Sequence, residues 1–298
     1  MGFDLPSYLG HCCHRVEAYM DLHLPAATAF PQPLFEAMRY SLFAGGKRIR
    51  PAFAFAAAEA VGGDGEAVLP FAAGLEMIHT YSLIHDDLPA MDDDDLRRGK
   101  PTCHKVYGEG TAILAGDGLL TDAFAVVTAP GVLARHPAER VARIVHELAV
   151  AAGTGGMVAG QALDLDATGR SVDLATLEFL HTHKTGALIR AAVRVGGLAA
   201  GAGSDPLEAL SCYAARLGLA FQIADDVLDV EGSTEQLGKP VGSDQGLDKA
   251  TYPALLGMEE SKRRAAQLMD EALEALAPFG PAGIPLAALA RFVVERTH

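Results

Sequence analysis

The residues best suited to chemistry are two clusters of aspartates. The first contains six aspartates within ten residues, in the stretch HDDLPAMDDDDLRRGK that begins at His85. The second contains three more, in the stretch FQIADDVLD that begins at Phe221. Carboxylate oxygens are hard ligands that suit Mg²⁺, and Mg²⁺ beside arginines is a common way for proteins to hold a diphosphate. Because arginines and lysines follow the first cluster, this pattern predicts a magnesium and diphosphate site.

A calcium site of the EF-hand type is the alternative for the first cluster, and the sequence argues against it. Counted from Asp87 or from Asp92, the loop has no glycine at the sixth position and no glutamate at the twelfth. The central aspartates, Asp93, Asp94 and Asp95, also have a structural interpretation, as a solvated N-capping start of the next helix. We favour that interpretation for these three residues and leave their role open.

The first cluster is expected at the C-terminal end of a helix that Pro89 stops. Glu76, His79, Leu83 and Asp86 recur at steps of three, four and three residues, so they share one face of that helix. Carboxylates are unfavourable beside the negative end of a helix dipole. We therefore expect a cation to compensate them, which is a sign of function rather than of stability.

The second cluster is predicted to line one stripe of another helix. Gln222, Asp225 and Asp229 recur at three and four residues in a segment that is otherwise apolar. Like charges at this spacing repel each other, and a metal ion shared with the first cluster would explain both motifs. The polar, glycine-rich segment that follows contains Lys239 and Lys249, and is predicted to be a loop that closes over an anionic ligand.

Two groups of basic residues could bind an anion. In GGKRIRP, Lys47, Arg48 and Arg50 follow two glycines at a predicted helix start, where the helix dipole disfavours cations unless an anion joins them. The alternative is a solvated basic turn. Lys184 lies in HTHKTGALIR, within an otherwise apolar helix, where a lone lysine usually extends its charged end to solvent.

The spacing of apolar residues predicts an all-α protein. They recur at three- and four-residue steps, and sustained period-two alternation is missing. With 50% hydrophobic and 21% charged residues, the 298-residue chain can bury a large core, and no composition shift divides it, so we expect one domain over residues 1–298. The glycine-rich segment 196–206 is predicted to be a flexible turn, because no strand precedes it as in a nucleotide-binding loop. Gln161 and Asp164, taken alone, are predicted to be ordinary surface residues.

Charge and composition argue against several classes of function. The formal net charge of −14 disfavours a nucleic-acid partner. The four cysteines form no CxxC pair, and the segment 11–14, HCCH, is interpreted as part of an ordinary helix rather than a zinc site. No apolar run is expected to reach the roughly 18 residues of a membrane span. Since the N-terminus also lacks the basic region of a secretory signal, we expect a cytoplasmic protein without stable membrane insertion.

Five motifs, in their order and at their intervals, closely resemble those of bacterial farnesyl diphosphate synthases, which belong to the trans-prenyltransferase family. The motifs are GGKRIRP, HDDLPAMDDDDLRRGKPTCH, GQALDLD, HKTGALIRAAVR and FQIADDVLDVEGSTEQLGKPVGSDQGLDKATYPALLG. The resemblance covers nearly the whole chain. It implies a single-domain, all-α bundle of long helices around a central cavity (the isoprenoid synthase fold), a homodimer, and Mg²⁺-dependent condensation of isopentenyl diphosphate with dimethylallyl and geranyl diphosphate to give farnesyl diphosphate.

The resemblance also assigns roles to residues of this sequence. The two aspartate-rich motifs, of the DDxxD type, would bind several Mg²⁺ ions through Asp86, Asp87, Asp92, Asp225, Asp226 and Asp229. The allylic diphosphate would be bound by Arg97, Lys184, Thr185, Gln222, Lys239 and Lys249. Isopentenyl diphosphate would be bound by Lys47, Arg50, His79 and Arg98. The residues expected to act most directly in catalysis are Asp86, Asp87, Asp92, Asp225, Arg97 and Lys184.

The implied reaction fits these residue types. Metal ions and cations stabilise the charge on the departing diphosphate, so an allylic carbocation forms in a dry pocket, the alkene of isopentenyl diphosphate attacks it, and a proton leaves. Tyr81 and Ser82 are the candidate residues for control of product length, because a bulky residue five positions before Asp86 resembles the family's stop near the farnesyl length. The alternative for Tyr81 is an ordinary core aromatic.

Several other functions remain open at this point. A geranylgeranyl or longer-chain synthase would differ only in the residues at the floor of the pocket. A class I terpene cyclase shares a DDxxD motif but lacks the GGKRIRP segment. A noncatalytic prenyltransferase subunit would be expected to lose one aspartate motif, and both are intact in this sequence.

Overall fold

The computed structural model describes residues 2–231 and 251–294 of the chain. Helices account for nearly all regular structure in these residues, which confirms the all-α prediction. In chain order they are α1 (Leu5–His23), α2 (Gln32–Leu42), α3 (Ile49–Ala60), α4 (Gly65–Asp86), α5 (Cys103–Tyr107), α6 (Glu109–Val127), α7 (Pro130–Leu133), α8 (Ala138–Ala152), α9 (Met157–Ala167), α10 (Leu174–His181), the π-helical turn η1 (Thr182–Gly186), α11 (Ala187–Ala199), α12 (Ser204–Glu231), α15 (Tyr252–Leu256), α16 (Met258–Glu274), the 3₁₀ turn η2 (Ala277–Gly283) and α17 (Ile284–Val294).

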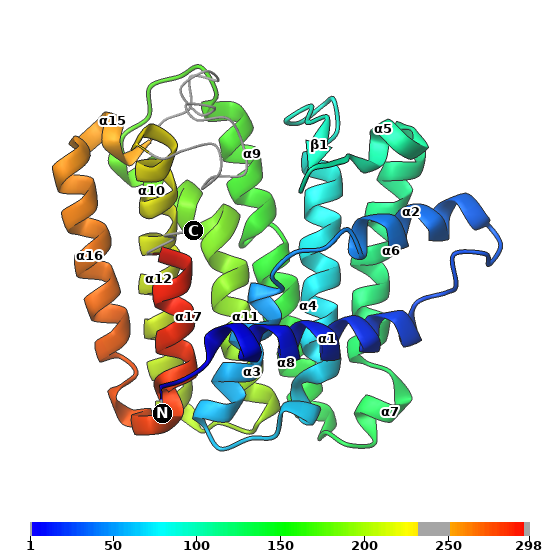
Figure 1. Cartoon of the computed structure of the whole chain (residues 1–298), viewed down its shortest axis with the longest axis horizontal. Helices are drawn as coiled ribbons and strands as arrows, with labels where there is room; N and C mark the ends of the chain where they lie inside the picture. The colour runs from blue at the N-terminus through cyan, green and yellow to red at the C-terminus, as the bar shows by residue number, and fades with distance from the viewer. Residues whose placement is uncertain (1, 232–250, 295–298) are drawn as a thin grey trace.

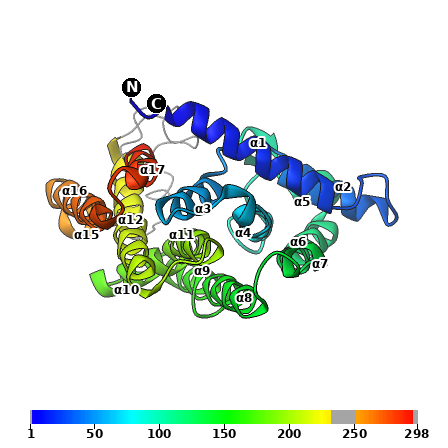
Figure 2. The same cartoon turned by 90° about the horizontal axis from the view of Figure 1, so that it is seen from below.

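Helix α4, which carries the first aspartates, lies in the middle of the bundle. It packs against α6, α3 and α11, while α11 also packs against α8 and α12. Figure 2 shows α4 with other helices on all sides, and Figure 1 shows α1 crossing the long helices. Helix α4 is therefore held by neighbours from both halves of the chain.

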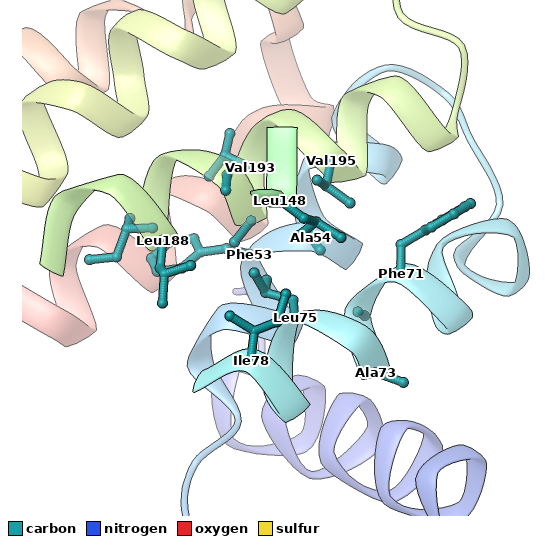
Figure 3. Packing of buried hydrophobic residues seen from close by; sticks show 14 of the residues in the cluster. Phe53, Ala54, Phe71, Ala73, Leu75, Ile78, Leu148, Leu188, Val193 and Val195 are labelled. Carbon is teal, nitrogen blue, oxygen red and sulfur yellow. The ribbon is translucent and has the colours of Figure 1, made fainter. Parts of the chain in front are cut away.

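The middle of helix α3, residues 51–58, is apolar on every side and lies inside the core. Residues 52–58 have 0% exposed surface, as expected for a helix without a polar face. Gly196 of α11 permits the close approach of the two helices, since a Cβ at this position would lie 2.8 Å from the carbonyl carbon of Ala54. Figure 3 shows side chains of α3 meeting those of α4, α8 and α11 in one continuous core.

The expectation of a flexible turn over residues 196–206 is wrong for both ends of that segment. Helix α11 continues to Ala199, and α12 begins at Ser204, so only four residues connect them. Gly196 and Gly197 lie inside α11, where glycine is normally destabilising. Packing explains both of them, because a Cβ on Gly197 would lie 2.8 Å from Cδ1 of Leu210.

A short β-hairpin follows the first aspartate cluster. Strands β1 (Leu96–Arg97) and β2 (Lys100–Pro101) pair antiparallel across a two-residue turn. The turn residues Arg98 and Gly99 have φ of 54° and 74°. Positive φ at both central positions is the conformation of a type I′ turn, which matches the twist of paired strands.

The hairpin also corrects the predicted role of Asp93, Asp94 and Asp95. These residues do not begin a helix, because the next one starts only at Cys103. Their carboxylates instead form ion pairs at the surface: Oδ2 of Asp94 lies 3.0 Å from Nη2 of Arg97, and Oδ1 of Asp95 lies 2.7 Å from Nζ of Lys105.

Three stretches of the described residues are long and apolar enough to cross a membrane, by length and composition alone. They are Gly65–Asp86, Glu109–Leu133 and Ala277–Val294. The expectation that no such stretch exists is therefore wrong. Glycine, proline and histidine interrupt these apolar stretches, but the mean hydropathy of each stretch stays as high as a membrane-spanning helix requires. In the first stretch, 72% of the apolar window is buried inside the protein, as its central position requires.

Candidate active site

Two adjoining pockets lie between α4, α9, η1 and α12. The first, the apolar pocket, has a volume of about 350 Å³ and includes Tyr81, Met157 and Leu188 in its lining. The second, the polar pocket, has a volume of about 450 Å³ and is lined by charged groups of both signs. The two linings share Arg50, Leu83, Lys184 and Thr185. A molecule with a charged head and an apolar tail could therefore occupy both pockets at once.

Lys184 lies between the two pockets because of an irregularity in the helix. It belongs to η1, a single π-helical turn between α10 and α11, and such turns occur often at functional sites. Glycines of neighbouring helices hold this turn closely: a Cβ on Gly160 would lie 2.5 Å from Cα of Lys184, and one on Gly218 would lie 3.1 Å from Cα of Gly186. The packing of three helices thus fixes where the lysine side chain begins.

The charge of Lys184 is balanced by carboxylates. Its Nζ lies 2.6 Å from Oδ2 of Asp164. Burial alone lowers the pKa of Lys184, but the carboxylates of Asp86 and Asp164 outweigh burial and raise the pKa above its usual value. Lys184 is therefore a fixed positive charge in the polar pocket.

The first aspartate motif divides between the pockets and the interior. Asp86 ends α4 in the lining of the apolar pocket, and Asp92 lines the polar pocket. Burial raises the pKa of Asp86 to about 6, against the lowering effect of Lys184. Asp87 is 3% exposed and accepts hydrogen bonds from Arg97, with Nε of Arg97 2.9 Å from Oδ1. Asp87 thus orients Arg97, which lines the polar pocket.

The second aspartate motif also separates into two parts. Asp225 is half-buried and lines the polar pocket beside Gln222. Asp226 is 5% exposed, with its Oδ2 3.1 Å from Nε2 of His181, and it accepts a hydrogen bond of 2.8 Å from the backbone N–H of Tyr252. Asp229 is 1% exposed. Asp226 therefore joins α12 to α10 and to the start of α15, although it too is part of the polar pocket's lining.

The basic segment at the start of α3 places its residues in different surroundings. Arg50 lines both pockets, and its Nη1 lies 3.2 Å from Nε2 of His79. Burial, together with the charges of Arg50 and Arg98, lowers the pKa of His79 well below its usual range, so the imidazole is neutral and can accept this hydrogen bond. Lys47 is exposed, with its Nζ 4.6 Å from the ring centre of Phe292.

The positions of Lys47 and Arg98 differ from that of Arg50. Arg98 donates a hydrogen bond to the carbonyl oxygen of Gly45, in the loop between α2 and α3. Within the part of the chain that the structure describes, neither Lys47 nor Arg98 lines the two pockets. The structure therefore places two of the four residues expected to bind isopentenyl diphosphate, Arg50 and His79, in the pocket linings, while Arg98 lies near enough for its charge to act on His79. Lys239 and Lys249, expected to bind the allylic diphosphate, lie outside the described residues.

Three residues of the site were missed or misjudged from the sequence. Gln161 and Asp164, predicted to be surface residues, lie in the pocket linings, and Asp164 is 9% exposed. Arg48 was grouped with the anion-binding candidates, yet it is 3% exposed and bound to two glutamates. The only sequence signal for Gln161 and Asp164 is their three-residue spacing, which places both side chains on the same face of α9.

Two buried donor atoms in the site have no hydrogen-bond partner among the described residues. They are Nε of Arg50 and Nε2 of Gln161. Since buried donors are normally paired, both fit a ligand that supplies acceptor oxygens. The lining of the polar pocket gives such a ligand cationic partners in Arg97 and Lys184.

The carboxylates suit Mg²⁺ by donor type rather than as a preformed cage. Within residues 2–231 and 251–294, no group of three or more acidic, histidine or cysteine side chains is arranged to hold a metal ion by itself. Mg²⁺ usually keeps several waters and takes one or two carboxylates together with substrate phosphates. Asp86, Asp92 and Asp225 present oxygens of this kind around the junction of the pockets.

The fold and the site define an all-α protein in which a pocket lined by charged groups adjoins an apolar pocket. The chain belongs to the polyprenyl synthetase family, which residues 31–277 match, and it is a transferase. It is 51% identical over 268 residues to a farnesyl diphosphate synthase of Geobacillus stearothermophilus, covering 90% of each chain. It is 47% identical to a geranylgeranyl diphosphate synthase of Cyanophora paradoxa, over 99% of this chain and 98% of the relative.

A solved structure shows the same fold. The geranyltransferase of Helicobacter pylori, complexed with magnesium and isoprenyl diphosphate, superposes with a TM-score of 0.83 at 32% identity, over 99% of this chain and 98% of that one. The fold is therefore that of the isoprenyl diphosphate synthases, as the resemblance of the motifs implied.

Proposed function

We propose that the protein is a Mg²⁺-dependent farnesyl diphosphate synthase, which condenses isopentenyl diphosphate with dimethylallyl diphosphate and then with geranyl diphosphate. The main support is the pair of adjoining pockets that share Lys184 and Thr185. A polar pocket with carboxylates and cations suits the diphosphate of an allylic substrate, and the apolar pocket beside it suits the prenyl chain. The farnesyl and geranylgeranyl diphosphate synthases among the relatives support the same substrate class.

In this proposal the polar pocket stabilises the departing diphosphate. Arg97, oriented by Asp87, and Lys184, held by Asp164, supply fixed positive charge toward the leaving group. Asp86, Asp92 and Asp225 would bind Mg²⁺, which when bound neutralises further negative charge on the diphosphate. Because Lys184 keeps a raised pKa, it stays charged as the carbon–oxygen bond breaks.

After the diphosphate departs, the allylic cation would lie beside the residues that both pockets share. The apolar lining excludes water, which would otherwise capture the cation as an alcohol. The Thr185 hydroxyl and the Gln222 side chain lie in the lining of the polar pocket, where their dipoles can face the positive carbon. Arg50 and the neutral His79 are the proposed partners of isopentenyl diphosphate on this side, and the unpaired Nε of Arg50 is available to a phosphate oxygen. The proton lost after alkene attack goes to the released diphosphate in this proposal.

Geranylgeranyl diphosphate synthase is the second candidate, supported by the relative from Cyanophora paradoxa. The difference depends on how far the prenyl chain can extend into the apolar pocket. Tyr81 is 7% exposed and lines this pocket with Ser82. Tyr81 lies five residues before Asp86, which is about 1.4 helical turns or about 7.5 Å along the helix. A phenol ring at this depth favours the shorter, farnesyl product.

Product analysis tests this function. Purified protein is incubated with Mg²⁺, dimethylallyl diphosphate and labelled isopentenyl diphosphate, and the dephosphorylated products are separated by chain length. Farnesol is the expected main product, and geranylgeraniol would support the second candidate instead. The variant Asp86→Ala should form no product, while Asp270→Ala, at an exposed position of α16, should match the wild type. No labelled prenyl product from the wild-type protein would overturn the proposal.

A further inference from the structure

The wall of the apolar pocket that faces α6 is made by a histidine. His85 lies one helical turn after Tyr81 on α4, and both residues line the pocket together. Their rings meet edge to face, with centroids 5.7 Å apart and an interplanar angle of 79°. His85 donates from Nε2 to the backbone carbonyl oxygen of Ile113 on α6, at 3.0 Å. The ring is therefore held at both ends, by Tyr81 and by α6.

Gly116 of α6 provides the space in which the His85 ring lies. A Cβ at this glycine would lie 2.5 Å from Cδ2 of His85 and closer still to Nε2. The three atoms nearest to such a Cβ all belong to the His85 ring, and the third, Cε1, would be 3.0 Å away. The backbone of Gly116 has no positive φ that would require glycine. The absence of a side chain at position 116 therefore leaves the space that the His85 ring occupies.

We propose that His85, seated on Gly116, is a specificity-determining residue that limits product length together with Tyr81. The inference depends on the proposed prenyltransferase activity and adds a second wall to its apolar pocket. Tyr81 blocks the prenyl chain along α4, and His85 blocks it sideways, between α4 and α6. Without the imidazole, the pocket would join the space over Gly116 and extend toward α6.

Two single variants should change product length in opposite directions. His85→Ala removes the wall, and the ratio of geranylgeranyl to farnesyl product should rise on the order of tenfold, the scale of discrimination that a few pocket atoms supply. Gly116→Ala leaves no room for the ring in its present place. Since the ring borders the apolar pocket, it should move into that pocket. The pocket would then hold a shorter prenyl chain, and the products should shift toward geranyl diphosphate.

The double variant separates this role from general damage. In His85→Ala/Gly116→Ala no ring remains to be displaced, so its products should match those of His85→Ala alone. Gly110→Ala is the matched control on the same helix, since a Cβ there has no atom within 4 Å. Product ratios are compared rather than rates, because His85 adjoins Asp86 and an injured metal site would lower turnover without changing the ratio. Circular dichroism melting shows whether each variant is folded.

The possible outcomes distinguish the inference from the function on which it depends. If the wild-type protein forms no prenyl product, the proposed function fails and the inference fails with it. If the wild type is active but His85→Ala and Gly116→Ala both keep its product ratio, the inference alone is overturned. If the double variant keeps the short products of Gly116→Ala, the glycine acts by another route and the inference is likewise overturned.

Discussion

Arg48 and Glu76 form an ion pair in the interior of the protein, with Nη1 of the arginine 2.9 Å from Oε1 of the glutamate. Both side chains have at most 2% of their surface exposed. Arg48 has a φ of 48° and also donates to Glu17 of α1 and to the carbonyl oxygen of Leu42 at the end of α2. One guanidinium thus ties together three helices around the loop that carries Lys47 and leads to Arg50.

This pair predicts a large loss of stability when the arginine is removed. Arg48→Met leaves the Glu76 carboxylate buried without its cation, and we expect a cost of about 3–5 kcal/mol in the free energy of unfolding, measured by denaturant titration. Arg170→Met is the control, since Arg170 pairs with Asp166 at the surface, where both side chains are 66% exposed. Equal stability losses in the two variants would contradict the role assigned to Arg48.

Arg48 also illustrates what the sequence could not predict. Helical periodicity placed Asp86 at the end of a helix and Gln222 and Asp225 on one stripe, because these relations depend on spacing within one element. Which charges become buried depends on distant elements that cover them. The sequence therefore did not reveal that Arg48 is enclosed by α1, α2 and α4, or that Asp164 of α9 pairs with Lys184 of η1.

Asp225 and Asp226, neighbours in the sequence, should respond differently to truncation. Asp225→Ala removes a carboxylate from the polar pocket, and we expect turnover to fall by orders of magnitude with little change in melting temperature. Asp226→Ala leaves the Tyr252 N–H and His181 without their acceptor, at a cost of about 1–3 kcal/mol per unpaired group. Steady-state kinetics and thermal melting of both variants test this. Near-normal turnover in Asp225→Ala would refute its assignment as a metal ligand.

Magnesium and a diphosphate should stabilise the fold together. The proposed site lacks a preformed cage among the described residues, so Mg²⁺ or inorganic pyrophosphate alone should bind weakly, and both together should raise the melting temperature. At concentrations near 100 times the dissociation constant the expected gain is about 2.7 kcal/mol. Differential scanning fluorimetry measures it, with EDTA reversing the effect. Asp86→Ala should abolish the shift and Asp270→Ala should keep it; a full shift in Asp86→Ala would exclude that carboxylate from the site.

The ion pair between Glu147 and Arg194 predicts a pH dependence of stability. Burial tends to raise the pKa of Glu147, but hydrogen bonds from Arg194, at 2.5 and 2.8 Å, outweigh burial and lower it. A lowered pKa in the folded state stabilises the protein above the unfolded pKa, and this stabilisation is lost as the pH falls through the folded value. Glu147→Gln should therefore lose less stability than the wild type between about pH 7 and about pH 3, measured by urea unfolding. Parallel curves for the two proteins would contradict the prediction.

Tyr81 should limit the product along the axis of α4. Its ring is buried in the lining of the apolar pocket, against His85. Tyr81→Ala removes the ring and should give products longer than farnesyl diphosphate. Tyr81→Phe keeps the bulk and loses only the hydroxyl, so its products should match those of the wild type. Chromatography of the dephosphorylated products compares the three proteins. If Tyr81→Ala still stops at the farnesyl length, a different residue forms the floor of the pocket, and the distinction from a geranylgeranyl diphosphate synthase must lie elsewhere in the lining.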